Sequence, residues 1–380
     1  MRVVIVNNIP APYFDPVFKI LGERAEWNLT VCYTSSWNQQ AGWVEAPLEE
    51  SSYRVVILDR KGSGISAGYR LLRELLNIRP EFLIIYGYTL IPQCLSITWS
   101  ILTGTPYALI GDANVYADKP SGVKGAVRNT WLRFVIRRAR ALIAIGTANR
   151  LFWERYGARY EQLFSAPYAV DNEHFKLEAT KAKSQLPETV EKTVFLFAGR
   201  FIKRKNVDLI IGAFRSINSD DVSLIIVGDG PERERLEALG SDDERILFAG
   251  AVPQADLPRY YAISDCLVLP AANEPWGLVV NEAMSSGLAV IIHKECGAAI
   301  DLVTSENGVL LESFEQAELE RAMQKVSKDP VKLAAMKAMS LERISGWTID
   351  GAARGIIEAV EASIGGEQPS KREAVIGEVK

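Results

Sequence analysis

Short, continuous apolar runs recur along this chain, and they constrain its fold more than any other feature of the sequence. Each run is rich in β-branched residues and is bounded by polar or turn residues. Continuous hydrophobicity is typical of strands buried on both faces, as in a parallel sheet covered by helices. Helical patterns, such as residues 69–77 and 128–140, lie between the runs. The sequence therefore predicts a doubly wound α/β architecture.

The runs form two sets, which a charged segment with little apolar periodicity separates. We predict an interdomain linker over that segment, residues 167–192. A length of 380 residues fits two domains, and we predict two similar α/β domains with a cleft between them. Helical spacing of apolar residues from Trp347 onward predicts a terminal helix, and the polar residues 367–380 predict a disordered tail. The predicted strands are residues 3–6, 29–33, 55–58, 82–86, 107–110 and 141–145 in the first set, and 194–198, 223–227, 246–248, 266–269 and 289–292 in the second.

Composition narrows the function classes. A net charge of −4 argues against general nucleic-acid binding, which needs a basic surface. The two histidines, His174 and His293, are too few for a histidine-rich metal site, and the four cysteines have no zinc-site spacing. The first apolar run is too short for a signal peptide, and no window is long enough for a membrane span. We expect a cytoplasmic protein with reduced thiols.

A basic loop follows the first strand of the second set. Gly199 lies at the turn, and four cations, Arg200, Lys203, Arg204 and Lys205, fall within six residues. Ligands of α/β sheets bind outside the carboxyl ends of the strands, where helix N-termini offer free N–H groups. Arginine and lysine at this place suit a diphosphate, although a solvated basic loop is an equally good interpretation of this segment alone.

A second loop, after residues 266–269, carries two carboxylates. Pro275 and Gly277 predict a turn, and a helix is expected to begin near Leu278. Glu274 then lies in the loop and Glu282 about one turn inside the helix. Carboxylates at a helix N-terminus can bind hydroxyl groups while backbone N–H groups hold a phosphate. For Glu282 alone, stabilisation of the helix dipole would be the simpler explanation.

These residues resemble the motifs of a known family. Glu274 and Glu282, with seven residues between them, resemble the paired-glutamate motif of the family 4 glycosyltransferases, which have the GT-B fold. Gly199-Arg200 with Lys205 resembles the phosphate-binding segment of that family. Residues 169–175, 227–231 (VGDGP) and 248–252 match further family motifs in the same order. The resemblance is strong over residues 165–312 and weak in the N-terminal half.

The resemblance implies a fold of two Rossmann-like domains that face each other across a cleft. Residues 1–168 would bind the acceptor, residues 169–346 would bind a nucleotide-sugar donor, and the terminal helix, residues 347–366, would cross back to complete the N-terminal domain. It also implies a retaining reaction, in which the leaving phosphate accepts the proton of the acceptor. A UDP- or GDP-sugar is the expected donor.

The resemblance also implies roles for individual residues. Arg200 and Lys205 would neutralise the diphosphate, and Glu274 would contact sugar hydroxyls near the anomeric carbon. Because the chain has no Asp-x-Asp triplet, we expect these cations to replace a divalent metal, and we expect no cofactor. The expected donor-binding groups are Glu282 at the ribose hydroxyls, the backbone N–H groups of Gly277, Leu278 and Val279 at the phosphates, and Val252 beside the base.

Two loops of the N-terminal half follow predicted strands and should face the cleft. Asn8 follows residues 3–6, and Asp112 and Asn114 follow residues 107–110. Many relatives place a sugar-contacting histidine in the second loop, but neither histidine of this chain lies there. Asp112 is our candidate for that catalytic position, and Asn8 and Asn114 are candidates for donor binding. The alternatives are a structural turn at Asn8 and a helix cap at Asp112.

A basic amphipathic helix is predicted over residues 124–140, where arginines and Lys124 are interleaved with large apolar residues. Such a helix can contact an anionic membrane or acceptor, so peripheral contact with the inner membrane face is one possibility. The alternative is a helix that covers the sheet with its apolar face and exposes its charges to solvent.

The leading hypothesis is a retaining glycosyltransferase that moves a sugar from a nucleotide diphosphate to a hydroxyl of a glycan, lipid-linked or small-molecule acceptor. One alternative is another GT-B enzyme, such as a nucleotide-sugar epimerase or a phosphorylase. A second is a non-catalytic protein that binds nucleotide sugars. A dinucleotide-dependent oxidoreductase is disfavoured, because the Gly228-Asp229-Gly230 segment has Arg233 where a third glycine belongs.

Overall fold

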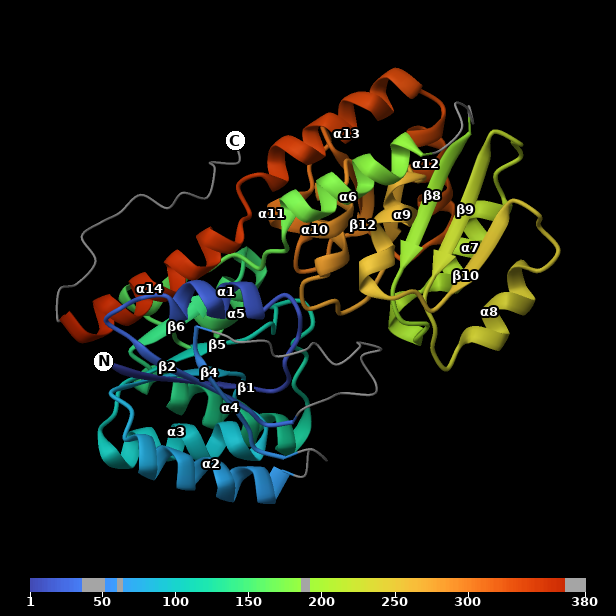
Figure 1. Cartoon of the computed structure of the whole chain (residues 1–380). Coiled ribbons are helices and arrows are strands. Elements are labelled where there is room, and N and C mark those ends of the chain that lie inside the picture. Colours follow the sequence, from blue (N-terminus) through green and yellow to red (C-terminus); the bar gives the residue numbers. More distant parts are fainter. Residues whose placement is uncertain (36–51, 60–63, 186–191, 366–380) are drawn as a thin grey trace.

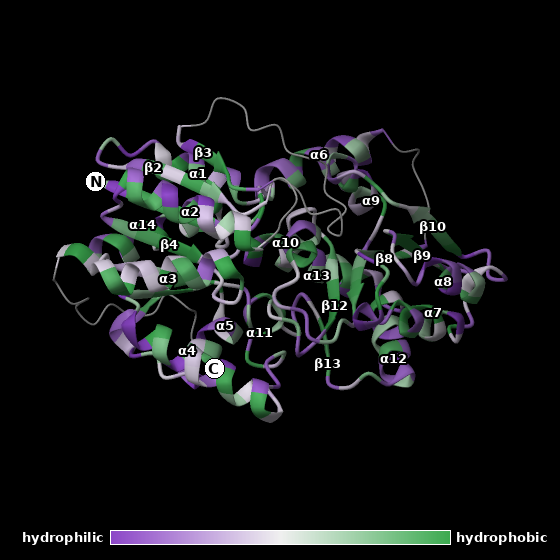
Figure 2. Cartoon of the chain, turned by 90° about the horizontal axis from the view of Figure 1, so that it is seen from below, coloured by the Kyte–Doolittle hydropathy of each residue, from purple (hydrophilic) through white to green (hydrophobic). Residues whose placement is uncertain are grey.

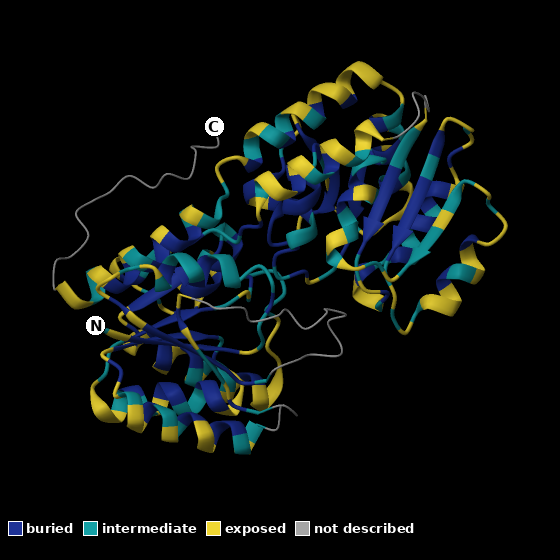
Figure 3. Ribbon diagram, viewed as in Figure 1, coloured by how far each residue is buried: buried dark blue, intermediate teal, exposed yellow. Residues whose placement is uncertain are grey.

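Two parallel β-sheets organise the chain, as Figure 1 shows. The computed structural model describes residues 1–35, 52–59, 64–185 and 192–365. Within them, one sheet has seven strands and the other has six. The residues of the central strands are mostly hydrophobic and buried (Figures 2 and 3). Each strand predicted from a continuous apolar run is present, so the α/β prediction is confirmed.

The first sheet has the strand order β3-β2-β1-β4-β5-β6-β7. The order reverses between β1 and β4, which is the switch point at which such sheets bind ligands. The side chains of Val3, Val4, Ile5 and Val6 are fully buried because helices cover both faces of β1. The strands are β1 (Arg2–Asn7), β2 (Asn28–Tyr33), β3 (Arg54–Ile57), β4 (Phe82–Tyr86), β5 (Tyr107–Ile110), β6 (Ala141–Ala144) and β7 (Leu163–Ser165).

Helices cover the two faces of this sheet unequally. The apolar side chains of α1 (Asp15–Gly22) join the core on one face. On the other face of the sheet, the core contains apolar side chains of α2 (Gly64–Ile78), α3 (Ile91–Thr103), α4 (Gly122–Arg138) and α5 (Thr147–Arg155). A short 3-10 helix, η2 (Tyr160–Gln162), precedes β7.

The second sheet has the order β10-β9-β8-β11-β12-β13 and the same doubly wound form. Its strands are β8 (Thr193–Ala198), β9 (Val222–Val227), β10 (Ile246–Gly250), β11 (Cys266–Leu269), β12 (Ala289–His293) and β13 (Gly308–Leu311). Its helices are α6 (Asn172–Ser184), η3 (Lys203–Lys205), α7 (Val207–Arg215), α8 (Arg233–Gly240), η4 (Gln254–Asp256), α9 (Leu257–Ala262), α10 (Leu278–Ser285), α11 (Ala299–Leu302), α12 (Gln316–Ser327) and α13 (Pro330–Ile344).

The interdomain linker predicted over residues 167–192 is wrong for half of that segment, because residues 172–184 form helix α6. Asp171 caps the helix by accepting the N–H of His174 at 2.9 Å. Phe175 and Ala179 are buried, and the helix packs on α9 and α10 of the second domain. Two buried residues are enough for α6 to pack on the domain, but they leave too little apolar periodicity for the sequence to predict a helix. The remainder of the predicted linker includes residues 186–191, which lie outside the described part.

The last helix, α14 (Ile349–Gly365), returns to the first domain (Figure 1). It packs on α1, β6 and β7. Gly355 permits this close approach, because a Cβ at that position would lie 1.8 Å from the carbonyl oxygen of Ser165. An ion pair of 2.6 Å between Arg24, which follows α1, and Glu361 of α14 adds a contact at the surface. The tail predicted to be disordered, residues 367–380, lies outside the described residues.

Candidate active site

A buried carboxylate held by two cations lies after β11. Oε2 of Glu274 accepts a hydrogen bond from Arg204 Nη1 at 2.7 Å and forms an ion pair with Lys205 Nζ at 2.8 Å. Glu274 and Lys205 are each 8% exposed, whereas Arg204 remains open to solvent. The structure thus brings the predicted residues Glu274 and Lys205 together. It adds Arg204, which sequence reasoning placed in the basic loop without giving it a role.

The two loops that carry these groups are joined through their backbones. The N–H of Ala272 donates to the carbonyl of Arg204 at 2.7 Å. Asn206, which has a left-handed φ of 52°, donates its side-chain amide to the carbonyl of Pro270 at 2.8 Å. These contacts fix the distance between the basic loop and Glu274. The cation–carboxylate cluster is therefore a rigid product of the fold.

The Gly228-Asp229-Gly230 segment has a packing role. A Cβ at Gly228 would lie 1.9 Å from the carbonyl oxygen of Gly199, and one at Gly230 would lie 2.5 Å from that of Phe201. Both glycines therefore let the loop after β9 press against the basic loop after β8. This close approach explains the glycines without a dinucleotide.

Arg200 differs from its neighbours in the basic loop. Its side chain is exposed, and within the described residues it makes no hydrogen bond or ion pair. A guanidinium at the carboxyl edge of the sheet can bind a phosphate through two parallel N–H donors. Arg200 and the pair of Arg204 and Lys205 together give this edge a concentrated positive charge.

Helix α10 begins at Leu278, as predicted, and its first turn is close to Glu274. Gly277 has the left-handed backbone (φ 96°, ψ 63°) that turns the chain into the helix. The first N–H groups of any helix have no preceding helical carbonyl to donate to. Those of Leu278 and Val279 therefore suit a phosphate oxygen. Val252, the predicted neighbour of the base, is half-buried after β10 at the same edge of the sheet.

Glu282 is buried one turn into α10, and it interacts with a residue that the sequence did not reveal. Its Oε2 accepts a hydrogen bond of 2.6 Å from the hydroxyl of Tyr261 on α9. Burial raises the pKa of Glu282 to about 7, although hydrogen bonds from Tyr261 and Gln254 oppose the change. Glu282 therefore titrates close to neutral pH.

Asp112 follows β5 and is electrostatically coupled to the Glu274 loop. Desolvation by the surrounding protein raises the pKa of Asp112, although the residue keeps solvent-exposed surface. The negative charge of Glu274 raises this pKa further, while Arg204 lowers it. The candidate residue of the N-terminal domain thus lies within electrostatic reach of Glu274 and Arg204 of the second domain.

Asn114 is fully buried where the domains meet, and its side chain binds the backbone of the loop that carries Glu274. Nδ2 donates to the carbonyls of Glu274 (2.7 Å) and Pro275 (3.1 Å). Oδ1 accepts the N–H groups of Tyr116 and Ala117. The donor-binding role expected for Asn114 stays a prediction. The contacts of its amide show that the residue also connects the domains.

Further contacts join the domains beside this site. Trp276 packs on Tyr168 and on Trp347, with ring centroids 6.4 Å and 5.1 Å apart. Asp301 Oδ2 accepts the N–H of Thr147 at 2.8 Å, at the start of α5. The partners of each pair are more than seventy residues apart in sequence, so no local pattern could have revealed them.

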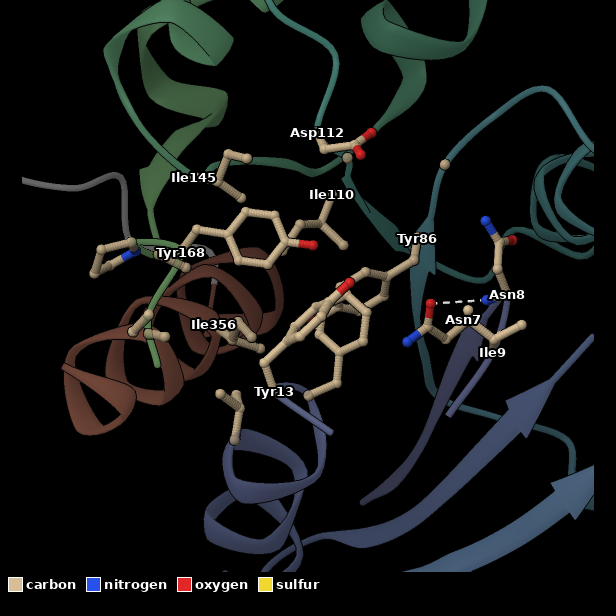
Figure 4. Close-up of a pocket in the computed structure, with 18 residues that line it drawn as sticks. Asn7, Asn8, Ile9, Tyr13, Tyr86, Ile110, Asp112, Ile145, Tyr168 and Ile356 are labelled. Atoms are coloured by element: carbon tan, nitrogen blue, oxygen red, sulfur yellow. Dashed lines mark hydrogen bonds between the residues drawn. The ribbon is translucent and has the colours of Figure 1, made fainter. Parts of the chain in front are cut away.

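A cavity of about 230 Å³ lies at the carboxyl edge of the first sheet (Figure 4). The predicted residues Asn8 and Asp112 line it. Oδ1 of Asn8 accepts a hydrogen bond of 2.6 Å from Gln93, which fixes its side chain. The donor-binding role of Asn8 stays a prediction, and the structure places the residue at the wall of a cavity rather than in a plain turn.

Part of the second domain is similar to a known protein family. Residues 178–342 match the family model described as glycosyl transferases group 1. The match contains the basic loop, both glutamates and α10, so the matched segment holds the cation–carboxylate cluster described above.

Two curated relatives are similar to part of the chain. One is a GDP-mannose-dependent alpha-(1-6)-phosphatidylinositol monomannoside mannosyltransferase of Mycolicibacterium smegmatis, 26% identical over 185 residues, which are 45% of this chain and 48% of the relative. The other is a D-inositol 3-phosphate glycosyltransferase 1 of Catenulispora acidiphila, 27% identical over 207 residues, which are 50% of each chain. The chain thus spans about half the length of the curated relatives it matches.

Solved structures extend the likeness of fold to both domains. Anabaena HepE, solved in complex with UDP and glucose, superimposes with a TM-score of 0.72 and 19% identity, covering 95% of this chain and 100% of that one. The chain therefore has the GT-B fold, as the sequence motifs indicated.

Proposed function

We propose that this chain is a retaining glycosyltransferase that takes its sugar from a nucleotide diphosphate and needs no metal ion. The observation that carries the proposal is the Glu274 carboxylate held by Lys205 and Arg204 at the start of α10. Transfer of a sugar from a diphosphate needs cations for the negatively charged leaving group, and beside them a carboxylate that accepts hydrogen bonds from the sugar hydroxyls. UDP or GDP is the nucleotide we favour, because a relative is named as GDP-mannose-dependent and a structural neighbour contains UDP.

In the proposed reaction the acceptor oxygen bonds to the anomeric carbon while the bond from that carbon to the diphosphate oxygen breaks. The leaving oxygen keeps the electron pair and then takes the proton of the acceptor hydroxyl on the same face of the sugar. Arg200, Lys205 and the N-terminus of α10 stabilise the growing phosphate charge. Glu274 accepts hydrogen bonds from the sugar hydroxyls, and Glu282 accepts those of the ribose.

Binding and donor hydrolysis test the proposal. Thermal unfolding with UDP, GDP and their sugars should show stabilisation by the matching nucleotide, because ligands of the folded state raise stability by mass action. Arg200→Ala and Lys205→Ala should abolish the slow hydrolysis of the donor. Lys203→Ala is a matched control, because Lys203 is an exposed cation of the same turn. If no nucleotide or nucleotide sugar changes the melting temperature, the proposal is wrong.

We further propose peripheral membrane contact through α4, and the pattern of its side chains supports it. Leu132, Val135 and Ile136 are buried on the sheet. The solvent side still carries apolar residues, with Val123 81% and Val127 66% exposed, beside several cations. Among the described residues, no helix has the length and hydrophobicity needed to cross a bilayer. Co-sedimentation with anionic vesicles should occur at low salt and decline at high salt. Absence of salt-sensitive binding would exclude this contact.

A further inference from the structure

The cavity of the N-terminal domain is walled by aromatic rings. Tyr13, Phe14, Tyr86 and Tyr168 line it, and apolar residues of α1 and α14 close its sides (Figure 4). Phe14 packs edge-on against Tyr86 and nearly parallel to Tyr168, with centroids 5.0 Å and 6.0 Å apart. Flat apolar rings favour a ligand that is itself a ring and presents an apolar face.

The described residues that line the cavity carry negative charge but no positive charge. Of the described residues that line the cavity, none is lysine, arginine or histidine, and Asp112 is its one ionisable carboxylate. A phosphate or carboxylate buried here would have no cation to pair with, and Asp112 would repel it. Burial of an unpaired charge is strongly unfavourable. The cavity is therefore suited to an uncharged ligand.

A buried hydrogen-bond donor faces the same space. Asn7 ends β1, lines the cavity and is 3% exposed. Its Oδ1 accepts the N–H of Asn8 at 2.7 Å, shown as the dashed line in Figure 4. Its Nδ2 is buried and has no hydrogen-bond partner among the described residues. Buried amide donors are nearly always paired, so this one is available to an oxygen atom of a ligand in the cavity.

The position of the cavity links it to the donor site. Asp112, at one side of the cavity, is coupled to Glu274 and Arg204. The ring of Tyr168, on another wall of the cavity, packs on Trp276, which lies in the same loop as Glu274. A ring bound among the tyrosines would thus place a hydroxyl near Asp112 on the side of the transferred sugar.

We propose that this cavity binds the acceptor as an uncharged ring alcohol, stacked on the tyrosines and hydrogen-bonded to Asn7 Nδ2, and that it rejects phosphorylated rings. The inference rests on the proposed function, and it specifies the acceptor class. It departs from the two relatives above, whose names specify a phosphatidylinositol derivative and an inositol phosphate.

Matched pairs of ligands test the inference. Binding of phenyl glucoside and its 6-phosphate, and of inositol and inositol 3-phosphate, is measured by calorimetry with the nucleoside diphosphate already bound. We expect the preferred neutral ring to bind at least tenfold more tightly than its phosphorylated partner. Equal or tighter binding of the phosphorylated rings, or no binding of any ring, overturns the inference. Absence of nucleotide binding would instead refute the proposed function.

Variants of Asn7 locate the site. Asn7→Asp keeps the acceptor for the N–H of Asn8 but removes the donor, and Asn7→Leu removes both. Each should weaken neutral-ring binding by on the order of tenfold while nucleotide affinity stays unchanged. Unchanged nucleotide affinity also shows that the variants fold. Asn77→Leu, on the exposed side of α2, is the control. If the Asn7 variants bind the neutral ring as the unmodified protein does, the assignment is wrong.

Discussion

Replacement of Glu282 by glutamine should stabilise this protein above neutral pH, although the residue belongs to the proposed donor site. Burial raises the pKa of Glu282 from 4.5 to about 7. Between these values the folded protein keeps a proton that the unfolded chain has lost. The contribution of Glu282 to the free energy of unfolding therefore falls as the pH rises through this window. Glutamine has nearly the same shape, cannot ionise, and can still accept the hydroxyl of Tyr261.

The size of the effect follows from the two pKa values. A tenfold change in a protonation equilibrium corresponds to about 1.4 kcal/mol, so a rise from 4.5 to about 7 costs about 3 kcal/mol once Glu282 is ionised. The carboxylate is 8% exposed, so solvent screens little of this cost. Glu282→Gln should therefore exceed the unmodified protein in stability by up to about 3 kcal/mol at about pH 8, and by little at about pH 4.5.

Urea unfolding at several pH values, monitored for both proteins, measures this difference. All other titrating groups are shared, so the difference between the two stability profiles isolates Glu282. Glu306→Gln, an exposed position in the same domain, is the control and should give a profile parallel to that of the unmodified protein. If the Glu282→Gln profile is also parallel, the argument from burial is refuted. The same variant should bind the nucleoside diphosphate more weakly, because a ribose hydroxyl loses a charged acceptor.

Three further predictions concern the loop of Glu274 and its surroundings. Asn114→Ala leaves the Pro275 carbonyl without its donor and the Glu274 carbonyl with only the N–H of Gly297, so it should lower the melting temperature by an amount equivalent to about 1–3 kcal/mol and reduce kcat of transfer. Lys205→Ala removes a cation from Glu274 and from the phosphates of the nucleotide. Calorimetry should show at least tenfold weaker nucleotide binding for this variant and unchanged binding for the control Lys203→Ala. Gly146→Ala would place a Cβ 2.3 Å from the neighbouring indole, and urea unfolding should show a loss of about 1–3 kcal/mol. Gly346→Ala, where the nearest atom is 3.9 Å away, should lose far less.

The sequence predicted the interior of both sheets because central strands are buried on both faces. It missed β7 and β13, which lie at sheet edges and are only three and four residues long, too short for a clear apolar run. It missed α6 because lysines and glutamates outnumber the two buried residues of that helix. In each case the missing element buries too little apolar surface to leave a pattern.

The candidate site likewise contains residues that the sequence predicted and contacts that it could not predict. Glu274, Lys205 and the start of α10 could be predicted, because their spacing belongs to local loops that follow strands. The pairing of Arg204 with Glu274 could not, because two adjacent cations look alike in sequence. The contact of Asn114 with Glu274 joins residues 160 apart and depends on the docking of two domains. The unpaired amide of Asn7 depends on the shape of a cavity.

Glu274 is held from both domains: Asn114 of the first holds its main chain, and Lys205 of the second holds its carboxylate. A rotation of one domain against the other would strain one of these bonds before it disturbed either core. If the chain binds the proposed donor, the affinity for that donor and the angle between the domains would therefore be thermodynamically linked. By reciprocity, an acceptor that favours the docked arrangement would strengthen donor binding by the same factor with which the donor strengthens acceptor binding. Glu274 would then help to convert the occupancy of one domain into a change of affinity in the other.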